Sequence, residues 1–193
     1  YVNAQYNVLL HGYQNELMAA ADDEAFPIHQ SGHSYMVQTG QLTKDNITDF
    51  STKINYWEFA YSYIYKINVF FSRIDAAPVD ATFKAGAIAE MQFLRAYIYA
   101  NLIWRYGGVP IITNVFGLHD DFKVTQSPYD DCVKFIDSEL DSAAAQLPPN
   151  QPASQEGRAS ANACLALKAR VLLYDASLLN NPSHDNTKWQ AAA

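Results

Sequence analysis

An apolar pattern of helical period runs through residues 83–106 and is the longest regular feature of the sequence. Its apolar side chains recur every three or four residues, a spacing that places them on one face of an α-helix. A glycine pair at 107–108 and Pro110 follow, and this order is typical of a helix C-terminus. The pattern therefore predicts a helix over 83–106, closed by a left-handed glycine cap. The apolar positions are Ile88, Met91, Leu94, Ile98 and Leu102.

Shorter patterns of the same period predict further helices on both sides of this segment. They cover residues 2–21, 53–74, 127–147 and 159–180, and Trp189 opens one more. The segment 53–74 is apolar on two sides, so we expect it to be sandwiched between neighbours, with Trp57, Tyr61 and Phe71 in the core. Ser127 is the predicted N-cap of its helix, because a proline at the first helical position follows it.

The sequence therefore predicts an all-α protein made of antiparallel, tetratricopeptide-like helix pairs with long connecting loops. The predicted pairs recur at about twice the standard tetratricopeptide spacing, so the match to that repeat is loose. Only residues 109–113 suggest a short extended piece. A chain of 193 residues, 49% of them hydrophobic, is long enough for one domain or at most two.

Charge and hydropathy exclude two classes of protein. The net charge is −7 and basic residues are not clustered, which argues against nucleic-acid binding. Apolar runs are too short for a transmembrane helix. The sequence begins at Tyr1 without a recognisable signal peptide, so it leaves open whether a targeting segment precedes it.

Motifs for catalysis or metal binding do not occur in the sequence. It contains neither a G-x-S-x-G elbow nor a zinc-binding H-E-x-x-H helix, and we expect no catalytic residue, no metal and no cofactor. Asp22, Asp23 and Glu24 leave a glycosidase carboxylate pair and a surface calcium site open, although a solvated turn explains them more simply. Cys132 and Cys164 are expected to be free and buried, with a disulfide between them as the alternative.

Residues from Pro27 to Ser51 lack sustained periodicity and predict a long loop. A connection of this length is uncommon unless it is functional. It combines aromatic rings, which can stack on sugar rings, with amide and imidazole groups that can bind hydroxyls. The alternative is that these side chains only pack the loop onto another part of the protein. The candidate ligand-binding residues are Phe26, His29, Gln30, His33, Tyr35 and Gln38.

Two linked segments carry a family resemblance. Residues 90–97 (Glu-Met-Gln-Phe-Leu-Arg-Ala-Tyr) and 106–113 (Tyr-Gly-Gly-Val-Pro-Ile-Ile-Thr) closely resemble the hallmark of the SusD/RagB family. Segment 17–24 is similar to the exit of that family's first helix. Segments 129–148 and 157–174 resemble its Tyr-Asp…Leu-Pro and Gly-Arg-Ala…Leu-Tyr helices. The matches occur in family order over almost the whole chain, and together they are specific.

The resemblance implies a fold, a location and partners. Members of the family are surface lipoproteins of the outer membrane in Gram-negative glycan users. They bind oligosaccharide or other nutrients without cleaving them, and they cap a SusC-like TonB-dependent transporter. By this resemblance residues 1–193 form the helical N-terminal region, and the C-terminal ligand-binding region lies outside the chain. An upstream lipid anchor is then the expected attachment to the membrane.

Two further expectations concern the helices themselves. A helical-repeat scaffold that binds a protein or peptide is the alternative function, with the aromatic-rich helices lining a groove. Arg95 is a charged residue on an apolar helix face and needs a buried partner, either Glu90 or a helix-end carbonyl. Arg170 repeats this situation, so we expect both arginines to hold helices together rather than to bind ligand.

Overall fold

The computed structural model describes residues 1–9, 23–26, 28, 33–43, 45 and 56–193. The chain divides into two compact units. The first unit consists of Tyr1–Tyr6 with Ala60–Ala193, and the second consists of Asn7–Phe59. All the regular structure among the described residues is helical, which confirms the predicted all-α fold class.

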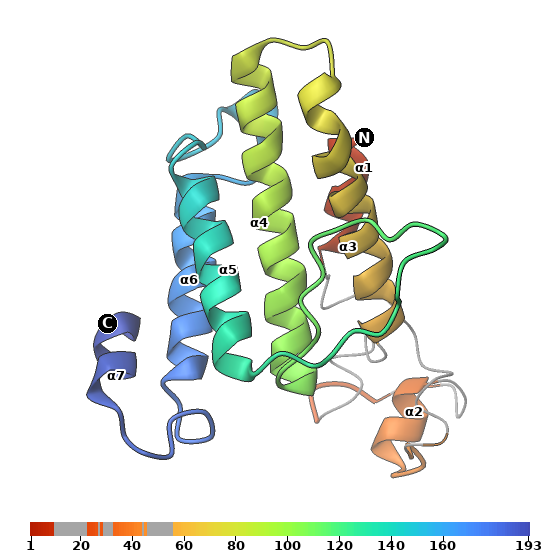
Figure 1. Cartoon of the computed structure of the whole chain (residues 1–193). Helices are drawn as coiled ribbons and strands as arrows, with labels where there is room; N and C mark the ends of the chain where they lie inside the picture. Colours follow the sequence, from red (N-terminus) through yellow and green to blue (C-terminus); the bar gives the residue numbers. More distant parts are fainter. Residues whose placement is uncertain (10–22, 27, 29–32, 44, 46–55) are drawn as a thin grey trace. The chain divides into compact units, whose positions relative to one another are not determined.

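Successive long helices of the first unit run in opposite directions (Figure 1). Helix α4 packs against α5, α5 packs against α6, and α6 packs against α7, while α1 lies against α4. This arrangement confirms the predicted antiparallel pairing. The helices are α1 (Val2–Gln5), α3 (Tyr56–Arg73, which begins in the second unit), α4 (Ala81–Tyr106), α5 (Tyr129–Ala144), α6 (Ala161–Asp175) and α7 (Asn186–Ala192).

Helix α4 supplies the centre of the core. Its periodic residues Met91, Leu94, Ile98 and Leu102 are fully buried, as the apolar pattern predicts. Burying one such side chain contributes roughly 1.5–3 kcal/mol. Asp80 begins the helix by accepting a hydrogen bond from the backbone N–H of Phe83 at 2.8 Å. The remaining core on α3, α5 and α6 includes Ile64, Ile67, Ile136, Leu140 and Val171.

The glycine pair after α4 has two different roles. Gly107 has φ 72° and ψ −139°, so its φ is positive as predicted, although its ψ lies outside the left-handed helical region. Gly108 lies against the chain that enters α5. A Cβ atom there would stand 2.2 Å from the backbone oxygen of Ser127. Only glycine fits at position 108, because a backbone segment passes directly over it.

Several helix ends differ from those predicted from the sequence. The predicted helix over 2–21 contains α1, a 3-10 turn at Tyr6–Val8 and a bend at residue 9, and residues 10–22 lie outside the described part. The helix predicted from Ser127 has Pro128 as its N-cap instead, because the Ser127 N–H bonds back to the carbonyl of Val109.

Helix α6 ends at Asp175 rather than at residue 180. The hydroxyl of Ser177 and the amide of Asn180 both donate hydrogen bonds to the carbonyl oxygen of Tyr174, at 2.6 and 3.0 Å. Side chains of this kind offer the backbone an alternative to the helix. Helix α7 starts three residues before Trp189 and is capped by Asp185.

A buried ion pair joins α4 to α5. Arg95 donates hydrogen bonds to both carboxylate oxygens of Glu139, at 2.7 and 2.9 Å, and another to Asn68 of α3 at 3.0 Å. Its guanidinium carbon also lies 4.3 Å from the centroid of the Phe71 ring. The expected buried partner therefore exists, but it is Glu139 and not Glu90. Arg170 is exposed, so the prediction that it too needs a buried partner was wrong.

Side chains replace sheet pairing where an extended piece was expected. Residues 109–113 form no strand in the described structure. The Ile112 N–H donates to the Tyr99 hydroxyl at 2.8 Å, and the Asn68 amide donates to the Ile112 carbonyl at 2.9 Å. The Tyr61 hydroxyl reaches the Pro110 carbonyl at 2.8 Å, so the predicted core residue Tyr61 anchors this segment.

Two other predictions about individual side chains have different outcomes. Cys132 and Cys164 are both free and buried, so the disulfide alternative is wrong. Trp57 was predicted in the core but is 41% exposed at the start of α3. The helical period alone cannot distinguish a wide apolar face from one whose edge reaches solvent.

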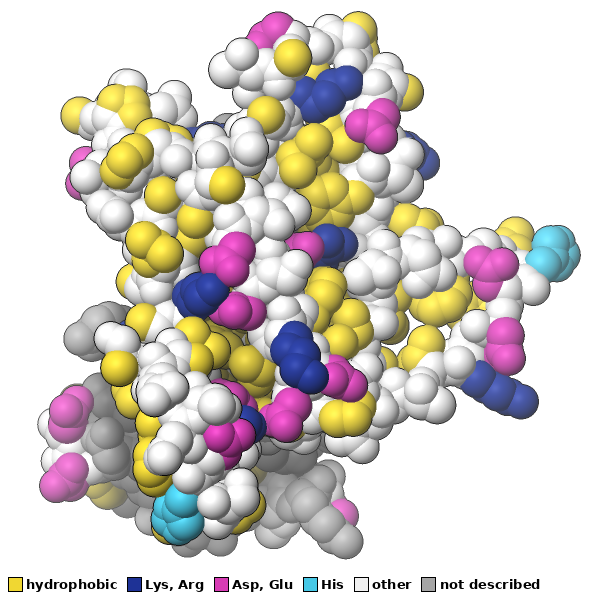
Figure 2. Space-filling model, turned by 60° about the vertical axis from the view of Figure 1, so that its left-hand side comes forward, with side chains coloured by type: hydrophobic (Ala, Val, Ile, Leu, Met, Phe, Trp, Pro, Cys, Tyr) yellow, Lys and Arg dark blue, Asp and Glu magenta, His cyan; other side chains and the backbone are white. Residues whose placement is uncertain are grey.

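The surface of α5, α6 and α7 carries mixed charge. Figure 2 shows basic side chains beside acidic ones on this face. Lys168 pairs with Asp141 at 2.8 Å, and Lys188 pairs with Asp130 and Asp175, each at 2.8 Å. Within the described part of the chain, no helix is both long enough and apolar enough to cross a membrane.

The second unit contains a short helix where the sequence predicted only loop. Helix α2 spans His33–Gln38, and residues 39–43 continue it as turn and coil. Its last turn is closed by backbone hydrogen bonds from Thr39 to Tyr35 at 2.9 Å and from Gln41 to Met36 at 2.8 Å. Six residues are too few for a periodic apolar pattern to be recognised, which explains the missed helix.

Candidate functional site

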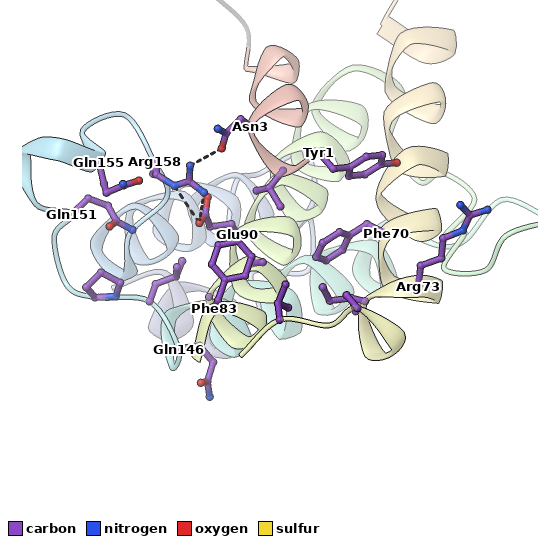
Figure 3. Close-up of a pocket in the computed structure, with 18 of the residues that line it drawn as sticks. Tyr1, Asn3, Phe70, Arg73, Phe83, Glu90, Gln146, Gln151, Gln155 and Arg158 are labelled. Atoms are coloured by element: carbon purple, nitrogen blue, oxygen red, sulfur yellow. Dashed lines mark hydrogen bonds and ion pairs between the residues drawn. The ribbon is translucent and has the colours of Figure 1, made fainter. Parts of the chain in front are cut away.

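An open cavity of about 850 Å³ lies in the first unit, bordered by α1, α3, α4 and residues 146–158 (Figure 3). Small-molecule sites in proteins commonly have volumes of about 300–1,000 Å³. The cavity is therefore large enough for a ligand of several rings. We describe its walls before asking what it binds.

Helix α4 supplies one wall of the cavity. Phe83, Ala87 and Glu90 lie four and then three residues apart, so they share one face of the helix. Phe83 is 59% exposed, although α4 is otherwise largely buried. Gly86 lies beside this row, and a Cβ atom added there would meet no described heavy atom within 4 Å. The small residues at 86 and 87 leave the space in front of Phe83 open.

Helix α3 and the N-terminal residue supply the aromatic part of the opposite wall. The ring of Tyr1 stacks on that of Phe70, with centroids 6.3 Å apart and planes 14° apart. The hydroxyl of Tyr1 donates to the Lys66 carbonyl at 2.7 Å, which holds this stack against α3. Phe70 and Phe83 lie on neighbouring helices and face the same space (Figure 3).

A hydrogen-bonded ion pair forms the polar end of the cavity. Arg158 and Glu90 approach to 2.7 Å, and Arg158 also donates to the side-chain oxygen of Asn3 at 2.6 Å. The Tyr6 hydroxyl donates to Glu90 at 2.5 Å and accepts from the Ala159 N–H at 2.9 Å. Burial is the main cause that raises the pKa of Tyr6 well above its usual range, so this phenol stays a donor.

Three glutamines also line the cavity. Gln151 donates to the Ala159 carbonyl at 2.5 Å, while Gln146 and Gln155 are exposed. An amide offers both donors and an acceptor. Aromatic rings beside amides suit a ligand that has an apolar face and a rim of hydroxyl groups. The described walls of the cavity thus combine aromatic rings, amides and one ion pair.

The six candidate residues predicted from the sequence belong to the second unit. Phe26 is 71% exposed in an irregular segment. Tyr35 and Gln38 lie on α2, and the Gln38 amide donates to the Ala25 carbonyl at 2.8 Å, which brings the end of α2 next to the residue before Phe26. His29 and Gln30 lie outside the described residues, and so does the side chain of His33, the first residue of α2.

Sequence reasoning missed the cavity because its residues come from distant segments. Tyr1, Phe70, Phe83 and Arg158 are separated by up to 157 positions, and no local motif joins them. Two features of the sequence fall on residues that line the cavity. Arg158 belongs to the family-like segment 157–174, and Gly86 interrupts an otherwise good helical pattern.

Comparison with known proteins decides the family. The model of the SusD-like family, described as starch-binding and associating with the outer membrane, matches residues 2–173. The chain belongs to the SusD-like family. This confirms the resemblance seen in segments 90–97 and 106–113. Among curated proteins, no sequence matches the chain.

Solved SusD-like structures share the fold. One SusD-like protein of Bacteroides fragilis is 26% identical with a TM-score of 0.73, and the alignment covers 99% of this chain and 37% of that one. A SusD-like carbohydrate-binding protein of the same species is 30% identical with a TM-score of 0.59, over 70% of this chain and 26% of that one. A laminarin-binding SusD-like protein is 22% identical with a TM-score of 0.76, over 95% and 41%. The chain thus spans well under half the length of these SusD-like structures.

Proposed function

We propose that this chain is the helical N-terminal region of a surface protein that captures oligosaccharides or other nutrients. The observation that carries the proposal is the SusD-like family match over residues 2–173, because that family is described as starch-binding. The 30% identical relative, which is named as carbohydrate-binding, supports the same ligand class. Glycan capture by the whole protein follows as the proposed activity.

The proposal extends to location and handover. The family description places its members at the outer membrane, and the motif resemblance implies a lipid-anchored protein on the cell surface. The captured oligosaccharide would then pass to a SusC-like TonB-dependent transporter. We place the membrane attachment in a lipid upstream of this chain and the transporter contact in the full-length protein.

The proposed protein binds its glycan without cleaving it. The acidic residues first considered for catalysis include Asp23 and Glu24, and both are exposed. A glycosidase holds its two carboxyl groups across a sugar-binding cleft, whereas Asp23 and Glu24 are adjacent residues at an exposed bend. Binding alone is the activity that the family and these positions support.

Residues 26–46 remain our proposed ligand contact in the second unit. Phe26 and Tyr35 would supply the stacking ring, and His29, Gln30, His33 or Gln38 would bind hydroxyls. The exposed ring of Phe26 supports this, because covering a large aromatic side chain with a ligand removes apolar surface from water and so favours binding.

One observation favours a second function. Helix α6 exposes Leu165, Leu173 and Tyr174, which are 54%, 62% and 50% accessible. Exposed apolar side chains are typical of surfaces that contact another protein. A helical-repeat scaffold would use such side chains to bind a protein partner, with glycan binding absent.

Fractionation of cells that express the full-length protein distinguishes glycan capture from the scaffold function. We expect a tagged full-length protein to be recovered in the detergent-solubilised outer membrane together with a TonB-dependent transporter. Recovery in the cytosol without such a transporter would contradict the proposed handover. A non-transporter protein recovered in its place would favour the scaffold.

A further inference from the structure

We propose that the cavity between α3 and α4 is a second binding site for a neutral glycan, separate from the contacts proposed for residues 26–46. This inference rests on the proposed function, because it adds a second site to the same glycan-binding protein. The residues that carry it are Phe70, Phe83, Gly86, Gln155 and the Glu90–Arg158 pair.

The aromatic walls provide the stacking surface. Phe83 projects from the first turn of α4, and more than half of its surface is exposed. Phe70 is held from behind by Phe71, in an edge-to-face contact with centroids 5.5 Å apart. A pyranose ring placed between them would cover apolar surface that otherwise faces water. Figure 3 shows both rings among the residues that line the cavity, one on α3 and the other on α4.

Gly86 marks open space in the cavity beside Phe83. It lies inside helix α4, where glycine is less favourable than alanine because it loses more backbone freedom on folding. A Cβ atom added there would find open space within 4 Å. A methyl group at position 86 would therefore fit, whereas a large side chain would enter the space that the proposed ligand occupies.

The charges of the cavity favour a neutral ligand. Glu90 and Arg158 neutralise each other at 2.7 Å, and Tyr6 and Asn3 take up further hydrogen-bonding positions on the pair. Arg73 also lines the cavity, and Figure 3 shows it on the side away from the Glu90–Arg158 pair. An acidic sugar bound beside the Glu90–Arg158 pair would therefore meet no uncompensated cation there. The exposed amides of Gln146 and Gln155 suit the hydroxyls of a neutral hexose.

The test fills the cavity in the full-length protein. Gly86→Phe places a ring in the open space, and Gly86→Ala is the matched control that adds only a methyl group. Calorimetric titration uses maltoheptaose and laminarihexaose as probes. We expect Gly86→Ala to bind like the wild type and Gly86→Phe to bind at least fivefold more weakly, without a lower melting temperature.

A second variant removes the stacking ring instead of filling the space. Phe83→Ala deletes a side chain that is mostly exposed, so the fold should survive. By analogy with base stacking on aromatic residues, we expect binding to weaken about five- to thirtyfold. The two variants test the same site, because Gly86→Phe adds side-chain volume to it and Phe83→Ala removes side-chain volume from it.

Three results would overturn the site. Wild-type affinity in both Gly86→Phe and Phe83→Ala would show that the glycan binds elsewhere. A melting temperature lowered by Gly86→Phe but not by Gly86→Ala would show that another part of the full-length protein fills the cavity. Failure of the wild type to bind either probe or any other neutral glycan would instead reject the proposed function, and the site with it.

Discussion

Replacing Arg95 with methionine should be among the most destabilising single changes in this protein. The change leaves the Glu139 carboxylate, whose side chain is only 11% exposed, without its cation. It also removes the hydrogen bond to Asn68 and the contact with the Phe71 ring. Breaking a buried pair by removing one partner costs about 3–5 kcal/mol. We expect a loss of this size in the free energy of unfolding.

The double variant Arg95→Met with Glu139→Leu separates the ion pair from simple packing. It removes both charges and keeps apolar volume, so no unpaired charge stays buried. Replacing both partners of a buried pair is often close to neutral. The double variant should therefore be several kcal/mol more stable than the sum of the two single variants predicts, which is the coupling that a double-mutant cycle measures.

Urea unfolding of the full-length protein, followed by helical circular dichroism, measures these differences. The exposed pair Lys134–Asp131, at 3.4 Å with side chains 78% and 55% exposed, is the matched control. Lys134→Met should cost less than about 1 kcal/mol. Single and double variants at 95 and 139 whose losses simply add would refute the reasoning, because they would show that the two side chains do not stabilise each other.

Four further predictions concern single residues. Gly108→Ala should lower the melting temperature measured by circular dichroism, because its Cβ would lie 2.2 Å from a backbone oxygen; an unchanged value would contradict the close approach. Burial raises the pKa of Cys164 to about 11, so at pH 8 its thiol should react with Ellman's reagent only after unfolding, and fast reaction of the native protein would count against it. Burial also raises the pKa of Tyr99 to about 12, whereas an unfolded tyrosine titrates near 10, so stability in urea should fall as pH rises from about 10 to 12; a flat profile would refute this. Phe26→Ala or Tyr35→Ala in the full-length protein should weaken glycan binding about five- to thirtyfold in calorimetry, and wild-type affinity in both would remove the segment from the site.

The sequence predicted those parts of the fold that depend on local pattern. Helix α4 begins and ends within two residues of its prediction, because its apolar period is long and Gly107 ends it. The prediction for α5 missed its start by two residues, since Ser127 is held by the carbonyl of Val109 rather than by the helix. A long-range hydrogen bond of this kind leaves no trace in local spacing.

Long-range partners were the part that sequence could not supply. Arg95 visibly needed a buried anion, but Glu139 lies 44 positions away, whereas Glu90 lies on the same helix. Glu90 pairs instead with Arg158, 68 positions away, and that pair closes one end of the cavity. The cavity itself depends on how α3 and α4 lie together, which the period of each helix alone does not define.

The most direct test of the proposed function is a calorimetric titration of the full-length protein with starch- and laminarin-derived oligosaccharides. Chromatography of the glycan after prolonged incubation accompanies it. Glycan capture predicts saturable binding of at least one neutral oligosaccharide, recovered at its original chain length. Shortened products, or the absence of binding across neutral glycans, would contradict the proposal that this SusD-like protein captures glycans without cleaving them.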